Sequence, residues 1–125
     1  FKVFGDGLQM RDFNYVDDVI EAMLLAAKAP EAIGEVFNLG SDEHVSLLDL
    51  ANQLTELSPG GRFELIPFPP DRKAIDIGDY YTDFTKISSI LGWKPKVTLA
   101  EGLRQTLAYY KKHHTHYWTA NDQVH

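Results

Sequence analysis

The sequence contains no cysteine among its 125 residues. A disulfide bond, a thiol nucleophile, an iron–sulfur cluster and a cysteine-type zinc site are therefore excluded. This composition is typical of a cytoplasmic protein. The sequence also lacks any apolar run close to the roughly 20 residues that a membrane-spanning helix requires, so we expect no membrane partner.

Positive charge is scarce as well, because 12 lysine and arginine residues face 18 aspartate and glutamate residues, for a formal net charge of −6. A negative field repels phosphate backbones, so we expect no nucleic-acid partner. The hydrophobic share of 44% and the charged share of 24% are typical of a globular protein rather than a disordered chain. The length is enough for one ordinary domain.

The chain also lacks an initiating methionine and a signal segment, since it opens at Phe1 without a basic stretch followed by a long apolar one. The apolar run from Phe1 to Phe4 ends in Gly5-Asp6-Gly7, a turn in which two residues can take a positive φ. We interpret the sequence as a fragment of a longer protein that begins inside a pattern already under way.

Alternating polar and apolar residues predict that Leu8 to Val16 is extended, with an irregularity near Asp12. Asp17 and Asp18 are expected to provide an N-cap and negative charge for the helix that follows, and Pro30 marks its end. The apolar residues that share one face predict the buried side of this helix. They are Val19, Ile20, Met23, Leu24 and Ala27.

A nearly uninterrupted apolar run from Glu35 to Gly40 predicts a strand buried on both faces, as in a parallel sheet. Ser46 followed by Asp49 has the spacing of a capping box and predicts the start of a second helix. A further strand is expected from Arg62 to Phe68. The predicted buried stripe of the second helix consists of Leu47, Leu50, Ala51, Leu54 and Leu57.

The prolines at positions 67, 69 and 70 exclude a helix there and predict an extended surface loop as far as Asp79. Asp83 is expected to cap a short helix that ends at Gly92. Thr98 and Glu101 have capping-box spacing and predict a last helix that reaches about Lys112. The residues expected to be buried on these two helices are Ile87, Ile90, Leu91, Leu99, Leu103, Leu107 and Tyr110.

About four helices in alternation with three or four short strands indicate the α/β class. The strand predicted from Glu35 to Gly40 needs a neighbour on each side, and the sequence provides too few strands to supply them. We therefore expect an incomplete α/β fragment, with a folded portion over residues 1–112 and a polar tail over residues 113–125.

Two glycines after an apolar run, Gly5 and Gly7, superficially begin a dinucleotide-binding fingerprint. The third glycine is missing, because Met10 stands in its place, and no helix is expected directly afterwards. A tight turn is the better interpretation. The sequence contains no Gly-x-x-Gly-x-x-Gly and no Tyr-x-x-x-Lys, so we expect no bound cofactor and no catalytic residue in this chain.

Arg11 stands between Met10 and Asp12 in the extended segment and has two interpretations. Its guanidinium could form a structural ion pair with Asp12 or with another nearby acid. It could instead bind phosphate, because a guanidinium donates two parallel hydrogen bonds to phosphate oxygens. The spacing alone leaves both interpretations open.

Three further polar positions are candidates for binding. Asn38 is the odd polar residue of its apolar run, where a buried amide must be hydrogen-bonded, either to loop backbone or to a ligand at the end of the strand. Arg72 and Asp76, with Lys73, occupy the proline-rich loop. Such a loop is either a solvated charged segment or a place for binding groups.

Metal binding is not favoured by the remaining polar clusters. His113, His114 and His116 lie in a polar tail and point in different directions, so a solvated tail is expected. Asp12, Asp17 and Asp18 match no calcium-loop spacing. We expect no metal in this chain.

The motifs taken together resemble the carboxyl-terminal portion of the NAD-dependent epimerase/dehydratase family, the extended short-chain dehydrogenases/reductases that modify nucleotide sugars. The resemblance covers about residues 1–112, with the motifs in the order and spacing of the family. The segments that carry it are Gly5 to Asp18, Val36 to Ser41, Leu91 to Pro95 and Glu101 to Leu103, with Thr106, Tyr109 and Tyr110.

This resemblance implies a Rossmann-type parent protein whose missing amino-terminal domain binds NAD and carries the catalytic Tyr-x-x-x-Lys pair. The parent would oxidise the C4 hydroxyl of a UDP- or dTDP-linked hexose. Arg11 matches the family's phosphate-binding arginine, and Asn38 matches a position near the same diphosphate. Arg72 and Asp76 fall where relatives carry an arginine for phosphate and a polar residue for ribose. Here the segment lacks the Pro-Gly of relatives and is one residue longer, so Lys73 is an alternative to Arg72.

Two hypotheses of function follow. In the first, the chain is the nucleotide-sugar-binding portion of an epimerase or dehydratase and is inactive alone. In the second, it is a stand-alone nucleotide-binding or interaction module without catalysis. A third possibility is a non-native homodimer, because an unpaired strand edge and apolar faces left uncovered in a fragment favour association.

Overall fold

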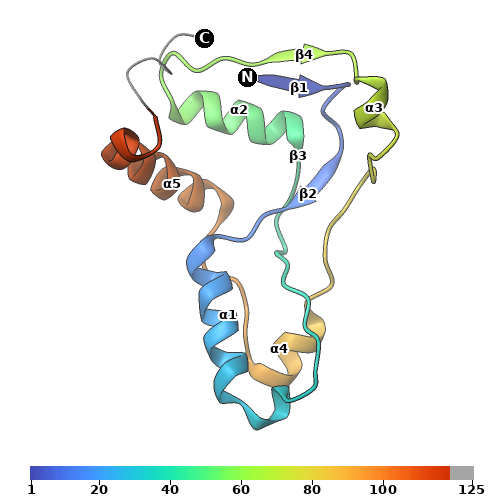
Figure 1. Ribbon diagram of the computed structural model, residues 1–125, viewed down its shortest axis with the longest axis vertical. Coiled ribbons are helices and arrows are strands. Elements are labelled where there is room, and N and C mark those ends of the chain that lie inside the picture. Colours follow the sequence, from blue (N-terminus) through green and yellow to red (C-terminus); the bar gives the residue numbers. More distant parts are fainter. Residues whose placement is uncertain (119–125) are drawn as a thin grey trace.

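The computed structural model describes residues 1–118, and its elements form an upper and a lower part in Figure 1. The upper part contains the strands β1 (Lys2–Phe4) and β4 (Glu64–Ile66), with the helix α2 (Leu47–Leu57) below them. The lower part contains the helices α1 (Val16–Lys28) and α4 (Thr85–Leu91). This division places α/β packing at one end and helix packing at the other.

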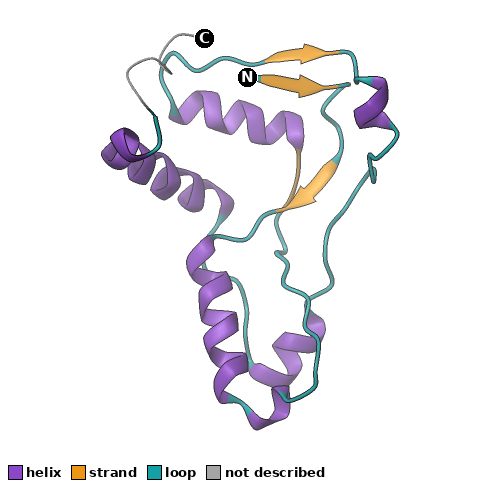
Figure 2. Ribbon diagram, in the orientation of Figure 1, coloured by secondary structure: helices purple, strands orange, loops and turns teal. Residues whose placement is uncertain are grey.

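Each of the two sheets in the described residues has two strands. β1 pairs with β4 in parallel, with Val3 opposite Leu65. β2 (Met10–Asp12) pairs in antiparallel with β3 (His44–Ser46), with Arg11 opposite Val45. Figure 2 shows that this second pair lies between the upper and the lower part. The turn after β1 needs its glycines, because Gly5 and Gly7 both have a φ of 71°.

Two helices, α2 and α5, start at the predicted capping residues, whereas Phe84 rather than the predicted Asp83 occupies the N-cap of α4. The Ser46 side chain accepts a hydrogen bond from the Asp49 amide (2.9 Å) at the start of α2. Thr98 does the same for Glu101 at the start of α5 (Leu99–His113). α5 packs against α2, and the leucines predicted for their inner stripes are half-buried around the fully buried Ala51. Both predicted N-caps are confirmed. The Glu101 carboxylate binds Arg104 and Gln105 rather than the Thr98 amide, so only this half of the predicted capping box is seen at α5.

The core of the lower part contains Ala22, Ile87 and Trp93, each no more than 2% exposed. Phe84 meets the Trp93 ring edge-on at a centroid distance of 6.0 Å. α4 ends at Gly92, which takes the left-handed conformation (φ 68°) as predicted. A 3-10 turn, η1 (Pro30–Ala32), follows α1 and contacts α4.

Two predictions about α1 are wrong. Tyr15 rather than an aspartate occupies the N-cap, and Asp17 and Asp18 lie in the first turn. Most of the predicted inner face points outward, with Met23 64% exposed and Leu24 55% exposed. The helix instead packs through Asp18, Ala22 and Leu25, because its apolar residues cover more than one face and the neighbouring Trp93 and α4 select among them.

The predicted strand from Glu35 to Gly40 does not form. Phe37 and Leu39 pack against the lower core, whereas Val36 is 78% exposed and Asn38 is exposed. The segment is therefore buried on one side and not on two. A strand requires a hydrogen-bonded partner along its edge, and none of the strands in the described residues lies beside this segment.

The prediction that the prolines at positions 67, 69 and 70 exclude a helix is wrong for one short segment. Pro70–Lys73 forms one turn, α3, with Pro70 in the first helical position, where its missing amide hydrogen is not needed. The tail continues α5 into a 3-10 turn, η2 (His114–His116), and residues 119–125 of the predicted tail lie outside the described part. Within residues 1–118, none of the helices has the length and apolar character required to span a bilayer.

Candidate functional site

Arg11 lies where three segments that are distant in sequence come together. Strand β2 carries Arg11, β3 lies on one side of it, and residues 78–82 lie on the other. Tyr80 forms a parallel bridge with Arg11, and its amide donates to the Met10 carbonyl at 3.0 Å. The Asp79 carboxylate accepts a hydrogen bond from the Met10 amide at 2.9 Å. The loop after α3 thereby adds a third extended segment next to β2.

The Arg11 guanidinium is held by main-chain carbonyls. Its Nη1 donates to the carbonyl oxygens of Met10 (2.7 Å) and Gly78 (2.5 Å). The side chain is half-buried, and no ion pair joins it to an acid of the described residues. The ion-pair interpretation is therefore wrong for Asp12. A guanidinium has five N–H donors, and those on Nε and Nη2 have no hydrogen-bond acceptor within residues 1–118.

Asp12 binds backbone amides instead of Arg11. One of its carboxylate oxygens, Oδ2, accepts hydrogen bonds from the amides of Ser41 (3.2 Å) and Thr82 (3.1 Å). The sequence analysis considered this residue as an ion-pair partner and as part of an acidic group without calcium-loop spacing, and it missed this role. The sequence signal for this close packing was the glycine at position 40. A Cβ atom there would lie 2.8 Å from Asp12 Oδ2 and 2.7 Å from the Thr82 carbonyl oxygen.

Asn38 lies on the exposed side of its segment. The premise of a buried amide that must be satisfied internally is therefore wrong. Its neighbour Val36 offers its carbonyl to Lys86 Nζ (2.9 Å), and Lys86 also pairs with Glu35 (2.7 Å). The segment that carries Asn38 is thus attached to α4, and Asn38 itself remains accessible from outside.

The candidate residues of the proline-rich loop differ in how many contacts they make with neighbouring side chains. Lys73 Nζ pairs with Asp76 at 3.2 Å and lies 4.9 Å from the centre of the Phe68 ring. The Asp76 side chain is only 10% exposed. The Arg72 side chain is 62% exposed and approaches Asp71 at 3.8 Å. Arg72 is therefore the more accessible of the two basic side chains.

Asp76 lines a pocket of about 260 Å³ together with Gln9, which lies two residues before Arg11. The other walls of this pocket are mainly apolar and come from β1, α2 and Phe68. The Gln9 side-chain oxygen is buried and has no hydrogen-bond partner among the described residues. A buried acceptor of this kind requires a donor. Arg11 does not line this pocket, so the pocket brings Asp76 together with Gln9 and not with Arg11.

The turn at Gly5 and Gly7 does not fit a dinucleotide. A side chain at Gly7 would lie 3.0 Å from Val3 Cγ1 and 3.1 Å from Leu48 Cβ, so the space beside the turn is filled by packed side chains. The next element is β2 and not a helix whose N-terminus could receive a pyrophosphate. The two glycines therefore serve the turn after β1.

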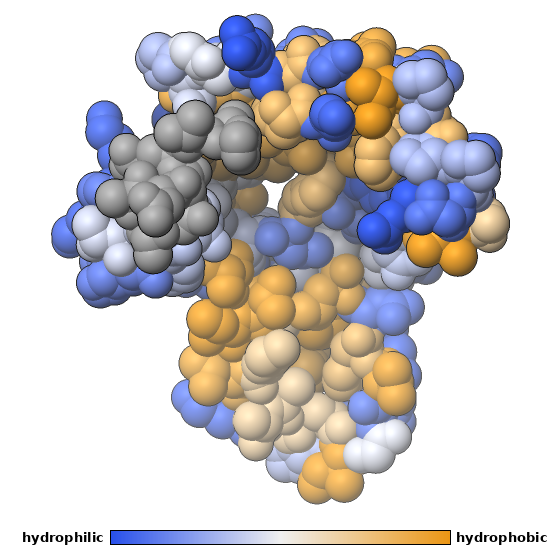
Figure 3. Space-filling model, turned by 45° about the horizontal axis from the view of Figure 1, so that its top comes forward, coloured by the Kyte–Doolittle hydropathy of each residue, from blue (hydrophilic) through white to orange (hydrophobic). Residues whose placement is uncertain are grey.

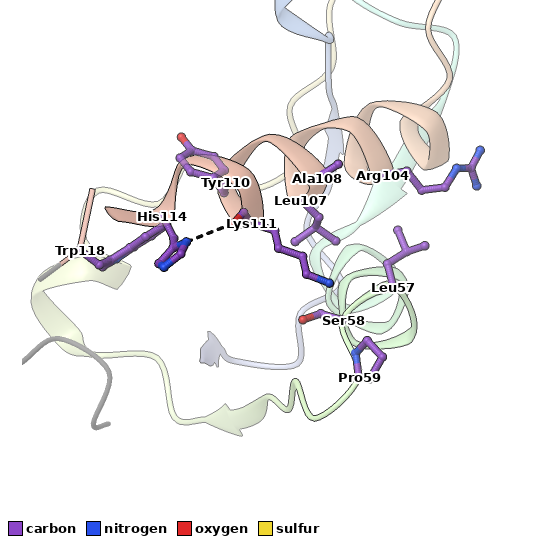
Figure 4. Close-up of a pocket in the computed structure, with 10 residues that line it drawn as sticks. All are labelled: Leu57, Ser58, Pro59, Arg104, Leu107, Ala108, Tyr110, Lys111, His114 and Trp118. Carbon is purple, nitrogen blue, oxygen red and sulfur yellow. Dashed lines mark hydrogen bonds between the residues drawn. The ribbon is translucent and has the colours of Figure 1, made fainter. Parts of the chain in front are cut away.

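The pocket in Figure 4 contains none of the four predicted site residues. It has a volume of about 570 Å³ and lies between the end of α2 and the second half of α5. Lys111 extends across it toward Ser58 in Figure 4, near the end of α2, where the carbonyl end of a helix favours a cation. That arrangement explains the lysine without a ligand.

The histidines and acids of residues 1–118 do not assemble into a metal centre. No group of three or more His, Asp or Glu side chains within residues 1–118 is arranged to hold a metal ion. His113 packs against Tyr109, and the His114 ring lies 3.1 Å from the Lys111 carbonyl. The tail histidines therefore take part in packing at the end of α5.

The sequence matches the family model described as GDP-mannose 4,6 dehydratase over residues 1–106. It is 36% identical over 121 residues to the dTDP-D-glucose 4,6-dehydratase of Mus musculus, which covers 93% of this chain and 33% of the relative.

Solved structures are similar as well. The fold matches a UDP-glucose 4-epimerase from Thermotoga maritima, determined with UDP-glucose, with a TM-score of 0.77 and 36% identity over 90% of this chain and 35% of the other. It also matches a UDP-glucuronic acid 4-epimerase from Bacillus cereus, determined with UDP-glucuronic acid and NAD, with a TM-score of 0.72, 32% identity and coverages of 89% and 35%. The chain thus spans about a third of the length of the relatives that it matches.

Proposed function

The chain belongs to the NAD-dependent epimerase/dehydratase family, whose GDP-mannose 4,6 dehydratase model covers most of it, and from this membership we propose that it is the nucleotide-sugar-binding portion of such an enzyme. The proposed substrates are UDP- or dTDP-linked sugars, because relatives with these substrates in their names match it. The proposed location is the cytoplasm, for which the lack of cysteine is the support.

The geometry of Arg11 is the observation that carries the proposal. Its guanidinium is oriented by the Met10 and Gly78 carbonyls through Nη1 alone. The remaining donors, on Nε and Nη2, form a planar edge that suits two oxygens of a diphosphate. A half-buried position strengthens such bonds relative to water. We assign Arg11 to the diphosphate of the nucleotide sugar.

Three other residues complete the proposed site. Arg72 is proposed as the second phosphate contact, in preference to Lys73, because Lys73 is engaged by Asp76 and by the Phe68 ring. Asp76 is proposed for the ribose, since a carboxylate accepts hydrogen bonds from hydroxyl groups. Asn38 is proposed near the diphosphate, where its exposed amide is free to reach a ligand.

Catalysis is assigned to the rest of the parent protein. The Gly5–Gly7 turn does not fit a dinucleotide, and the sequence has no Tyr-x-x-x-Lys pair. We therefore propose that NAD and the catalytic residues belong to the portion of the parent that this chain does not contain, and that the chain alone is inactive. The chain would hold the diphosphate, so that binding energy from this remote group positions the sugar carbon that reacts.

An exposed apolar face supports the proposal that another portion of the parent protein binds NAD. On α1, Ile20 is 47% exposed, Met23 64% and Leu24 55%, and beyond the helix Ile33 is 83% and Val36 78% exposed. Figure 3 shows hydrophobic residues gathered over the lower part of the molecule. Exposed apolar patches mark interaction sites. We propose that this face, defined by these five residues, packs against the NAD-binding portion of the parent.

Calorimetry of the 125-residue chain with UDP, dTDP and their glucose derivatives tests the proposal. A binding portion that lacks its partner is expected to bind weakly, with a Kd on the order of 1 mM, and addition of NAD should not change the result. A Kd on the order of 1 μM without NAD would favour the stand-alone module. Absence of any binding to UDP or dTDP at roughly 10 mM ligand would contradict the proposed site.

A further inference from the structure

We propose that Asp12 is a positioning residue of the nucleotide-sugar site, because its carboxylate ties residues 40–41 and 82 to β2 and thereby fixes the segment that orients Arg11. This inference rests on the proposed function of Arg11. Asp79 assists at the other end of the same segment. Neither aspartate is proposed to touch the ligand.

One oxygen atom of Asp12 joins three segments of the chain. Asp12 Oδ2 accepts the amides of Ser41 at 3.2 Å and Thr82 at 3.1 Å, residues that lie 29 and 70 positions away in the sequence. Within residues 1–118 the carboxylate has no ion-pair partner. Hydrogen bonds from amides to a charged carboxylate are stronger than those between neutral groups. Through these two bonds the oxygen links β2 to the segments that contain Ser41 and Thr82.

Residues 78–82 are hydrogen-bonded to β2 on both sides of the contact between Arg11 and Gly78. Asp79 Oδ1 accepts the Met10 amide at 2.9 Å, and the Tyr80 amide donates to the Met10 carbonyl at 3.0 Å. Gly78, whose carbonyl receives Arg11 Nη1, directly precedes Asp79. Loss of the Asp12 carboxylate would release residue 82, whereas after loss of the Asp79 carboxylate the Tyr80 amide would still hold the segment to Met10.

Gly40 lies too close to Thr82 and Asp12 for any residue with a side chain. This residue is buried, and a side chain on it would lie 2.7 Å from the Thr82 carbonyl and 2.8 Å from Asp12 Oδ2. Real side chains do not approach a backbone oxygen so closely, so glycine is required here for space rather than for its φ. The tight approach of residue 40 to residue 82 is therefore built around the Asp12 carboxylate.

Asp12 lies outside the hydrophobic core of the lower part. The lower core consists of Ala22, Ile87 and Trp93 with their neighbours, and Asp12 is not among them. The strand pair β2–β3 is also held by its own ladder. Removal of the Asp12 charge is therefore expected to leave the fold in place and to release the segment next to Arg11.

The test compares Asp12→Asn with Asp42→Asn in the 125-residue chain by ¹H–¹⁵N NMR, with the Arg11 Nε–H and Trp93 Nε1–H signals as probes. Asp42 is an exposed neighbour of Ser41 and provides the matched loss of one charge. Without ligand, Asp12→Asn should shift the Ser41, Thr82 and Arg11 Nε–H signals and leave the Trp93 signal unchanged. Asp42→Asn should leave the Thr82 and Arg11 signals in place.

Titration with UDP then separates the two claims. Asp12→Asn should weaken UDP binding about tenfold, the loss expected when a charged hydrogen-bond acceptor becomes neutral, whereas Asp42→Asn should not. If the wild type binds UDP and Asp12→Asn binds equally well with an unmoved Arg11 signal, the positioning role is overturned. If the wild type does not bind UDP although Asp12→Asn moves the Arg11 signal, the proposed function fails and the positioning of Arg11 stands. A collapsed spectrum for both Asp12→Asn and Asp79→Asn would make Asp12 a folding residue and overturn the proposal.

Discussion

The buried indole of Trp93 donates its Nε1–H to the main-chain carbonyl of Asp18 at 2.9 Å, across 75 positions of sequence. The carboxylate of the same aspartate accepts the amides of Lys96 (3.1 Å) and Val97 (3.0 Å). The start of α1 is thereby tied to the connection between α4 and α5. This contact holds the lower part of the molecule together.

Replacement of Trp93 by Phe should destabilise the chain by about 1–3 kcal/mol, because the Asp18 carbonyl then loses its donor in a buried place. Urea unfolding followed by circular dichroism measures the change. Trp118→Phe provides the control, since Trp118 is 46% exposed and its loss should change the free energy of unfolding by less than about 0.5 kcal/mol. Equal effects of the two substitutions would contradict the assigned role of Trp93.

Glu101 predicts a pH dependence of stability. Hydrogen bonds from Gln105 and then from Arg104 lower the pKa of its carboxyl below the ordinary value of 4.5. A pKa that is lowered in the folded state adds stability above the unfolded value, and this stability is lost as the pH falls through the folded pKa. Glu101→Gln should therefore be less stable than the wild type at neutral pH.

The difference between Glu101→Gln and the wild type should shrink below about pH 4.5, where the carboxyl becomes protonated. Glu56→Gln, an exposed change on α2, serves as the control. Thermal unfolding between about pH 3 and 7 measures both. A difference that stays constant with pH would show that the Glu101 charge does not contribute.

The uncovered apolar face predicts self-association. If no other surface covers Met23 and Leu24, which are 64% and 55% exposed, two copies should bury them against each other as concentration rises. Met23→Glu should shift sedimentation toward the monomer, because a charge on this face opposes burial. Ile75→Glu, at a 71% exposed position on the loop after α3, should not. A monomer at all concentrations for the wild type would refute the homodimer.

Local signals in the sequence were sufficient for three helix ends. Ser46, Thr98 and Gly92 act within one or two turns of chain, so their spacing predicted the caps of α2 and α5 and the end of α4. The parallel pairing of β1 with the segment predicted from Arg62 to Phe68 could not be read from local patterns, since it joins residues about sixty positions apart.

The errors have one physical origin, which is dependence on distant partners. The segment from Glu35 to Gly40 has the composition of a buried strand but lacks a strand beside it within residues 1–118. The inner face of α1 was decided by Trp93 and α4 rather than by its own apolar period. At the site, Arg11 was singled out by its type, whereas its acceptor, the Gly78 carbonyl, could come only from the folded loop.

Binding of UDP compared with uridine, in the wild type and in Arg11→Ala, tests the central claim most directly. The two ligands differ by the diphosphate, so the wild type should bind UDP more tightly. Arg11→Ala should lower UDP affinity about 10- to 100-fold, as expected for loss of a charge-assisted pair, and leave uridine binding unchanged. Arg62→Ala, which removes an exposed guanidinium elsewhere, should change neither. Retention of the full preference for UDP over uridine in Arg11→Ala would contradict the account.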